Sequence, residues 1–259
     1  MKNLITCLVL LISLFLTSLA TAGPNTIYTN EVGEGWVDSI SNNGVATGAN
    51  SGANQYFMWT QKTGNQFIGG VSPGNNVGGQ AGVSDNGTFI CGSMLNIKTG
   101  YHEAGRYNVQ SETWTPLGGI GGSSGNSVSS GWGISGDGST IVGLAWEDAG
   151  TAYATRWSVF GKPTSLGSSV PGSSTRANGT NEDGSVVVGW QDTAYRQGAV
   201  WTNGNQQLIY RPDGDEAFEA SAVSSDGLWV TGLGIGPFNG SGDTYRYNTI
   251  TNEIGRAHV

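Results

Sequence analysis

The chain has 259 residues and a formal net charge of −8, and only 12% of its residues are charged. A protein that binds nucleic acid presents a basic face, so this charge balance argues against nucleic acid as a partner. The 44 glycines disfavour helices, whereas nine Trp, nine Tyr and seven Phe supply bulk for a core. The composition therefore predicts an all-β protein of short strands and tight turns.

The first 22 residues have the pattern of a signal peptide. Lys2 supplies the positive start, Leu4–Leu16 form an apolar stretch, and Ala20-Thr21-Ala22 is a small-residue cleavage site. The apolar stretch is too short for an ordinary transmembrane helix, and no comparable stretch follows it. We predict an exported protein, extracellular, at the cell surface or periplasmic, with no transmembrane span in the mature chain; an uncleaved anchor is the alternative. Residues 23–35 are expected to be a short N-terminal lead-in.

Five segments after the leader share one pattern, in which Ser or Asn precedes Asn-Gly or Asp-Gly and a β-branched stretch then ends on glycine. The third segment shows it clearly, with Ser135, then Asp137-Gly138, then Thr140-Ile-Val-Gly143. Asn-Gly and Asp-Gly supply the positive φ that tight hairpin turns require, so each segment predicts a hairpin. The five structural turn glycines are Gly44, Gly87, Gly138, Gly184 and Gly227.

Two further strand signals follow each hairpin. An aromatic residue closes the third strand, and a Leu-Gly pair or its equivalent marks the fourth, as in Ala154-Thr-Arg-Trp157 and Ser165-Leu-Gly167. A fixed period of four strands in a meander predicts a β-propeller, because neighbouring blades cover the two faces of each sheet. A sandwich or barrel is the alternative. The predicted propeller domain is 36–253, with repeats at 36–79, 80–129, 130–175, 176–218 and 219–253.

The last six residues, 254–259, have the appearance of a sequencing artefact. Ile-Gly-Arg-Ala-His-Val back-translates to ATC-GGA-AGA-GCA-CAC-GTC, which resembles a common short-read adapter. We therefore expect a truncated gene, a natural protein that continues past Glu253, and an incomplete last repeat. A C-terminal anchor is among the features that such a truncation would remove. Arg256 and His258 carry no functional argument for the same reason.

The repeat resembles the HAF repeat family, which is described as extracellular repeats. The resemblance covers residues 36–252 and rests on the Ser-x-Asp-Gly turn, the Val-Val-Gly strand end, the aromatic-closed third strand and the Leu-Gly fourth strand. The His-Ala-Phe tripeptide that names the family is absent, and His102-Glu-Ala-Gly comes nearest. The resemblance implies a secreted or surface protein, in some cases part of a larger surface protein, and it implies no established reaction.

Few residues offer catalytic chemistry. His102 is the only histidine outside the suspect tail, so the sequence supports neither a Ser-His-Asp arrangement nor a histidine zinc site. Cys91, the single cysteine after the leader, stands where other repeats place Thr or Val, so we expect a buried and unreactive thiol. The turn aspartates Asp137, Asp183 and Asp226 are interpreted as structural, because Asn replaces them in two repeats.

Carboxylates outside the repeat pattern leave two alternatives open. A glycosidase needs two carboxylates about 5–10 Å apart across a pocket. The candidates are Glu147, Asp148, Asp192, Asp213, Asp215, Glu216 and Glu219. Calcium is a second alternative at Asp213, Asp215 and Glu216, although this loop lacks the full calcium-loop spacing and suits a solvated loop equally. No other metal or cofactor is predicted.

The loops between the second and third strands form the expected binding face. These loops are longer and more varied than the Asp-Gly turns, and such loops commonly carry function. Trp beside Asp suits a sugar, since the ring stacks and the carboxylate accepts hydroxyl groups, and the same aromatics suit a protein partner. The predicted ligand-binding residues are Trp146, Asp148, Tyr153, Trp190, Asp192 and Tyr195. The alternative is that these aromatics pack between blades.

Three functions remain open from the sequence. The first is a non-catalytic secreted or cell-surface propeller that binds glycans or proteins through its long-loop face. The second is a propeller-type glycan hydrolase that uses loop carboxylates. The third is a structural repeat region of a larger surface protein. The absence of a catalytic cluster favours the first.

Overall fold

The structure, a computed structural model, describes residues 35–50, 52–74, 77–159, 162–234 and 244–256. The predicted signal peptide, the lead-in up to residue 34 and the last three residues of the suspect tail lie outside the described residues. Every regular element in the described residues is a β-strand. That part of the chain contains no helix with the length and hydropathy needed to cross a membrane.

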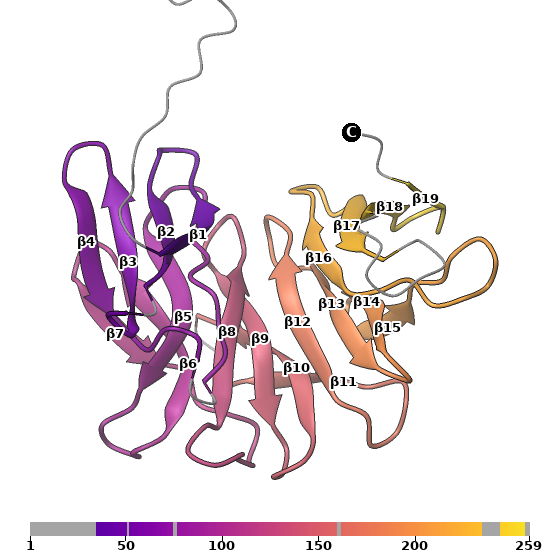
Figure 1. Cartoon of the computed structure of the whole chain (residues 1–259), viewed down its shortest axis with the longest axis horizontal. Helices are drawn as coiled ribbons and strands as arrows, with labels where there is room; N and C mark the ends of the chain where they lie inside the picture. Colours follow the sequence, from indigo (N-terminus) through magenta and orange to yellow (C-terminus); the bar gives the residue numbers. More distant parts are fainter. Residues whose placement is uncertain (1–34, 51, 75–76, 160–161, 235–243, 257–259) are drawn as a thin grey trace, which may run out of the picture. The chain divides into compact units, whose positions relative to one another are not determined.

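The strands form five antiparallel sheets, blades 1 to 5, in which strands adjacent in sequence pair as meanders (Figure 1). Blade 1 has β1 (Trp36–Ile40), β2 (Ala46–Asn50), β3 (Gln55–Thr60) and β4 (Gly64–Gly69); blade 2 has β5 (Phe89–Leu95), β6 (His102–Asn108) and β7 (Thr113–Pro116). Blade 3 has β8 (Ser129–Ile134), β9 (Thr140–Trp146), β10 (Ala152–Ser158) and β11 (Thr164–Gly167). Blade 4 has β12 (Thr175–Thr180), β13 (Val186–Asp192), β14 (Arg196–Thr202) and β15 (Asn205–Leu208); blade 5 has β16 (Ala220–Val223), β17 (Trp229–Leu233), β18 (Thr244–Asn248) and β19 (Ile254–Arg256).

Two blades differ from the predicted strand pattern. Blade 2 has three regular strands, and its predicted first strand is reduced to an isolated bridge between Val83 and Ile90. Blade 5 has four strands, so the prediction of an incomplete last repeat is wrong. Its fourth strand, β19, uses residues 254–256 of the suspect tail. A strand forms there because pairing with β18 needs only the main chain, and Asn252, with a φ of 61°, closes the turn.

One repeated set of hydrogen bonds holds the Asp-Gly turns. In blade 3, Ser135 Oγ donates to Asp137 Oδ1 over 2.6 Å, and the same oxygen accepts the main-chain N–H of Ser139 over 2.8 Å. Blade 5 has the corresponding bond from Ser224 Oγ to Asp226 Oδ1, at 2.5 Å. All five turn glycines have a φ between 70° and 84°. The turn aspartates are therefore bonded within the scaffold.

The same turns connect neighbouring blades through the main chain. The N–H groups donate from Asn42 to Asp85, from Asp85 to Gly136, from Asp137 to Glu182 and from Glu182 to Ser225, over 2.8–3.2 Å. Each turn thus satisfies a main-chain group of its neighbour. The repeat therefore determines both the shape of a blade and its attachment to the next one.

The turn aspartates predict a contribution to stability that is lost in acid. Hydrogen bonds from Ser185 lower the pKa of Asp183, and bonds from Ser224 and Leu228 lower the pKa of Asp226. A lowered pKa means that the folded chain binds these protons less tightly than the unfolded chain. The stabilisation is therefore fully present above the unfolded pKa of about 3.9, and it is lost as the pH falls through the folded values.

The double variant D183N/D226N tests this contribution. Asn occupies the same turn position in two blades, so the turns should form without the ionisable groups. We expect the Tm of the variant to fall less than that of the unchanged protein as the pH decreases from about 5 to about 2. Circular dichroism melts across this range measure the effect. Parallel Tm profiles for the two proteins would contradict the prediction.

The first strand of four blades carries a β-bulge at the same position of the repeat. The bulged residues are Asp38, Trp132, Asn178 and Ser221. A bulge changes the direction of a side chain and displaces the main chain from regular register. A glycine lies within the second strand of each of these blades, and a Cβ there would be only 1.9–2.4 Å from a carbonyl oxygen of the first strand or of the residue before it, as found for Gly48, Gly143, Gly189 and Gly232. This close approach explains the glycine in the Val-Val-Gly pattern.

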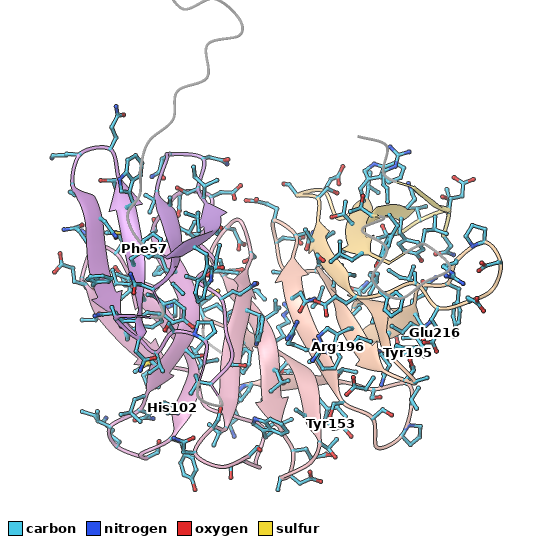
Figure 2. The ribbon with its side chains drawn as sticks, viewed as in Figure 1. Phe57, His102, Tyr153, Tyr195, Arg196 and Glu216 are labelled. Carbon is cyan, nitrogen blue, oxygen red and sulfur yellow. The ribbon has the colours of Figure 1, made fainter. Side chains whose placement is uncertain are left out.

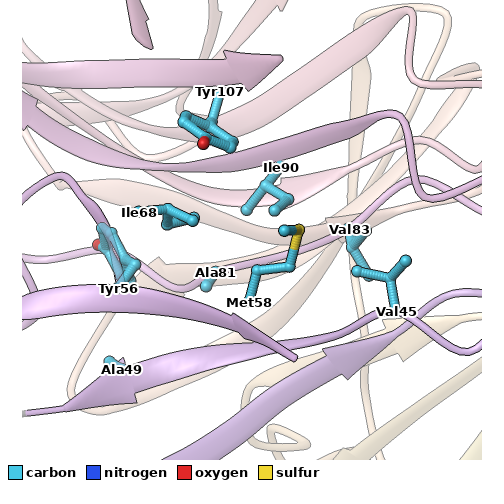
Figure 3. Packing of buried hydrophobic residues seen from close by; sticks show 9 residues of the cluster. All are labelled: Val45, Ala49, Tyr56, Met58, Ile68, Ala81, Val83, Ile90 and Tyr107. Carbon is cyan, nitrogen blue, oxygen red and sulfur yellow. The ribbon is translucent and has the colours of Figure 1, made fainter. Parts of the chain in front are cut away.

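The hydrophobic core lies between neighbouring blades. Val45 and Met58 of blade 1 pack with Ile90 of blade 2 (Figure 3). Trp157 belongs to the cluster that joins blades 2 and 3, and Trp201 to the cluster that joins blades 3 and 4. Each blade therefore covers a face of its neighbour, which is the physical reason that a four-strand period predicts a propeller.

Candidate functional site

The first segments of all five repeats converge on one small cavity, the central pocket. Its lining includes Asp38, Gln80, Trp132, Asn178 and Ser221, one residue from each repeat. The cavity has a volume of about 200 Å³, and Asp38 is the one ionisable group in its lining. The bulges therefore direct their side chains toward a shared space that contains few groups for recognition.

A second cavity of about 360 Å³, the Trp/Arg pocket, is formed mainly by blades 3 and 4. Its large and charged lining residues are Trp132, Trp146, Trp190, Arg176, Arg196 and Asp192. Trp132 also lines the central pocket, so the two cavities meet at the bulge of β8. The volume lies within the range of about 300–1,000 Å³ that is usual for small-molecule sites.

Strand register assembles most of the Trp/Arg pocket. Trp146 is the last residue of β9, and Asp192 is the last residue of β13. Antiparallel pairing places Arg176 of β12 opposite Trp190 of β13, and Arg196 of β14 opposite Asp192. Blade 4 therefore brings four of the six side chains together through its own hydrogen-bonding pattern.

Both guanidinium groups stack on tryptophan rings. The guanidinium carbon of Arg176 lies 3.7 Å from the ring centroid of Trp132 and 5.1 Å from that of Trp190. The guanidinium carbon of Arg196 lies 4.6 Å from the Trp190 centroid. Glu219 connects the two cations, at 3.4 Å from Arg176 Nη2 and 3.7 Å from Arg196 Nη1. Cation–π contacts and ion pairs together hold the arginines in the pocket wall.

The Trp/Arg pocket gathers two guanidinium groups in an acidic chain, and Glu219, outside its lining, pairs with both of them. Burial lowers the pKa of Arg176 to about 10; Glu219 acts in the opposite direction, and Arg196 lowers the pKa further. Arg176 therefore remains protonated at neutral pH. The lining contains two arginines and one carboxylate, that of Asp192. An anionic group entering the pocket would lie beside two guanidinium groups, which attract it electrostatically.

Three of the six predicted ligand-binding residues, Trp146, Trp190 and Asp192, line the Trp/Arg pocket. Asp148, Tyr153 and Tyr195 are not in its lining. Asp148 accepts two main-chain N–H groups of its own turn, over 2.8 and 2.7 Å. These hydrogen bonds tie the carboxylate of Asp148 to the main chain of its own loop.

The aromatics of this loop face have different environments. Tyr195 is 57% exposed and meets the ring of Phe218 edge-on at 5.9 Å, whereas Tyr153 is half-buried on β10 (Figure 2). Trp190 is only 5% exposed, so its ring is mostly packed within the blades. Trp190 therefore fits the alternative in which the aromatics pack between blades, and Tyr195 fits it less well.

Three side chains of the Trp/Arg pocket, Trp132, Arg176 and Arg196, are absent from the sequence prediction. At the repeat position of Trp132 the other repeats have Asp38, Ala81, Asn178 and Ser221. A tryptophan at this position is unusual among the repeats. This difference is the sequence signal that marks Trp132 as a candidate site residue. Arg176 likewise stands where blade 3 has a serine, and Arg196 where blade 3 has an alanine.

An arginine occupies the loop considered for calcium. Arg211, whose side chain is 8% exposed, forms ion pairs with Asp213 and Asp215. Glu216 accepts a hydrogen bond from Thr193 Oγ1 over 2.8 Å. Across the described ranges, no group of three or more His, Cys, Asp or Glu side chains is arranged to hold a metal ion. Calcium at this loop stays a prediction, and an incoming ion would have to displace Arg211.

Two observations bear on catalytic chemistry. Cys91 is fully buried, and burial raises the pKa of its thiol to about 12, which confirms the predicted buried thiol. Each of the two pockets has one carboxylate in its lining, Asp38 in the central pocket and Asp192 in the Trp/Arg pocket. A glycosidase needs two across one pocket. Neither lining supplies the pair that a propeller hydrolase requires.

Five sequential meander blades around a shared pocket define a β-propeller, and solved propellers have the same fold. TolB from Acinetobacter baumannii matches with a TM-score of 0.57 and 12% identity, over 85% of this chain and 53% of that one. A putative TolB from Agrobacterium tumefaciens matches with a TM-score of 0.56 and 14% identity, over 86% of this chain and 80% of that one.

These similarities establish the fold alone, because the identities are low. The chain spans about half the length of the Acinetobacter TolB that it matches. No protein-family model and no curated protein sequence matches the chain. Since one fold supports many functions, the function must be argued from the pockets of this chain.

Proposed function

We propose that the protein is an exported, non-catalytic β-propeller that binds a glycan in the Trp/Arg pocket. The observation that carries the proposal is the convergence of three tryptophans with charged and polar groups in one cavity of about 360 Å³. Small-ligand sites combine aromatic walls with a few placed polar groups, and this cavity has that composition. The export part of the proposal rests on the signal-peptide pattern at residues 1–22.

The polar lining suits the hydroxyl groups of a sugar. Ser130 Oγ accepts the indole N–H of Trp132 over 2.9 Å, and Ser174 Oγ accepts the main-chain N–H of Ala152 over 3.1 Å. A hydroxyl that accepts such a bond retains its own hydrogen to donate. Asp192 adds a carboxylate that accepts hydrogen bonds from hydroxyl groups. The cavity therefore offers donors and acceptors beside aromatic surface, which is the combination that a sugar ring uses.

Replacing Trp146 by alanine is expected to weaken glycan binding at least about tenfold, because the ring is a wall of the cavity and buried aromatic anchors dominate binding energy. Trp146 lies at a strand end and is half-buried, so the blade should fold without it. Affinity electrophoresis through gels containing bacterial or plant polysaccharides identifies a retarding glycan. Isothermal titration calorimetry with that glycan then measures the loss.

Trp229→Ala is the matched control, because Trp229 is 37% exposed on β17 and lies outside the pocket lining. We expect this variant to bind the glycan as the unchanged protein does. The proposal is wrong if no polysaccharide retards the unchanged protein, or if the Trp146 and Trp229 variants bind equally.

Protein binding is a second candidate function, favoured by the loop between β5 and β6. The last residue of β5 and two residues of this loop are exposed and apolar, with Leu95 at 44%, Ile97 at 89% and Tyr101 at 39%. Exposed aromatic and aliphatic residues that lie together are typical of interaction sites. Ile97→Ser separates the two functions, because it should abolish binding of a protein partner and leave glycan binding in the Trp/Arg pocket unchanged.

A further inference from the structure

We infer that the Trp/Arg pocket recognises a carboxylated saccharide, with Arg196 and Arg176 binding the carboxylate of a hexuronate unit. This inference rests on the proposed glycan-binding function and names the class of glycan. Two guanidinium groups converge on one cavity in a chain that has only 11 Lys and Arg residues and a net charge of −8. A neutral sugar would gain little from this arrangement, whereas a carboxylate gains charge-assisted hydrogen bonds.

Arg196 has hydrogen-bonding capacity to spare. Its side chain is 55% exposed, and within the described part of the chain its guanidinium makes one ion pair, to Glu219 at 3.7 Å, and no hydrogen bond. The stack on Trp190 holds the guanidinium plane at the pocket wall (Figure 2 shows the place of Arg196 on blade 4). A planar guanidinium presents pairs of N–H groups that match the two oxygens of a carboxylate. Arg196 is therefore the main carboxylate-binding group.

Arg176 supplies a fixed positive charge beside Arg196. Its side chain is 12% exposed, its Nε donates to Asn178 Oδ1 over 2.8 Å, and its guanidinium lies on the ring of Trp132. These contacts order the side chain before a ligand arrives, so little conformational entropy is lost on binding. Its charge acts strongly on the pocket, because the effective dielectric of a buried site is lower than that of water.

The lining offers partners for both the carboxylate and the hydroxyl groups of a hexuronate unit. Arg176, Arg196 and Asp192 are the charged side chains of the lining, and Glu219, outside it, pairs with both arginines. Asp192 accepts hydrogen bonds from neutral hydroxyls. A hexuronate combines a single carboxylate with several hydroxyls, so it satisfies the arginines and Asp192 together. Trp146 supplies an aromatic wall for the apolar face of the sugar ring.

The test compares an acidic and a neutral disaccharide of the same linkage, α-1,4-digalacturonate and α-1,4-galactobiose, on the full chain. Isothermal titration calorimetry measures affinity, and tryptophan fluorescence reports occupancy of the pocket. We expect digalacturonate to bind at least about tenfold more tightly than galactobiose, because only the acid makes charge-assisted bonds. Raising the salt concentration should weaken binding of the acid and leave binding of the neutral sugar unchanged.

Two variants test whether Arg196 is the residue that causes the preference for the acidic disaccharide. Arg196→Gln should weaken digalacturonate binding about tenfold and bring it close to that of galactobiose. Arg246→Gln is the matched control, because the Arg246 guanidinium also stacks on a tryptophan, 4.4 Å from the ring centroid of Trp229, but lies outside the pocket lining. Digalacturonate binding that falls with Arg196→Gln and persists with Arg246→Gln supports the inference.

Other outcomes overturn it, and they distinguish it from the proposed function. If both disaccharides bind equally and only Trp146→Ala weakens them, glycan binding stands and the hexuronate preference falls. If a triglutamate peptide binds and depends on Arg196 while neither disaccharide binds, the pocket recognises acidic peptides and both proposals fall. If neither disaccharide binds and no polysaccharide retards the protein, the proposed function itself is wrong.

Discussion

Replacing Trp201 by alanine is expected to lower the free energy of unfolding by about 3–5 kcal/mol. Trp201 is 1% exposed near the end of β14, and it packs in the cluster with Val142 and Ala154 of blade 3. The substitution removes buried apolar surface and leaves a cavity that strands on both sides cannot close. Since a domain is stable by only about 5–15 kcal/mol, urea titration should show a large fall in the unfolding midpoint.

Two other variants test the reason for this loss. Trp229→Ala removes a ring that is already 37% exposed, so we expect a loss below about 1 kcal/mol. Trp201→Phe keeps most of the bulk and removes an indole N–H that is buried without a hydrogen-bond partner in the described structure. It should therefore cost clearly less than Trp201→Ala. Equal losses for Trp201→Ala and Trp229→Ala would contradict the assignment of the core to the surfaces between blades.

Replacing Gly189 by alanine is expected to destabilise the fold by about 3 kcal/mol although it adds a single methyl group. The new Cβ would lie 1.9 Å from the carbonyl oxygen of Arg176, because the bulge in β12 brings that main chain close. The clash involves main chain on both sides, so side-chain rotation cannot relieve it. Any shift of β12 also moves Arg176 away from Trp132, so glycan binding should weaken together with stability.

Gly179→Ala provides the control within the same blade. A Cβ at Gly179 would meet its nearest heavy atoms at 3.6 and 3.8 Å, which is ordinary van der Waals contact. We expect a change below about 1 kcal/mol, and a stabilising one, because alanine restricts the unfolded chain more than glycine does. Urea unfolding of both variants makes the comparison. A similar loss in both would show that strand glycines matter through flexibility rather than through close approach.

The order of the strands could be predicted because its signals are local. Asp137-Gly138 defines a turn within two residues, and an aromatic such as Trp157 marks the end of a third strand. The bulge at Trp132 could not be predicted in the same way, since the displacement of its main chain appears only when two strands pair. The strand β19 was missed because main-chain pairing can form a strand whatever the origin of its side chains.

Only part of the Trp/Arg pocket was accessible from the sequence. Trp146, Trp190 and Asp192 stand out beside a long loop, but Arg176 and Arg196 reach the pocket through the pairing of three strands in blade 4. The register also shows which positions of blades 3 and 4 correspond to each other. Trp146 pairs with the first residue of β10 and Asp192 with the first residue of β14, so Trp146 corresponds to Asp192 and not to Trp190. Sequence spacing alone could not separate these positions.

The repeated bulge has a consequence for how such a protein can diversify. Its main-chain geometry is matched by a glycine on the partner strand, and residues as different as Asp38, Trp132, Asn178 and Ser221 occupy the bulged position. Substitution there leaves strand pairing intact and changes the wall of a shared cavity. Each repeat that carries the bulge therefore adds one position to the interior, and the chemistry of that interior can evolve one blade at a time while the scaffold stays the same.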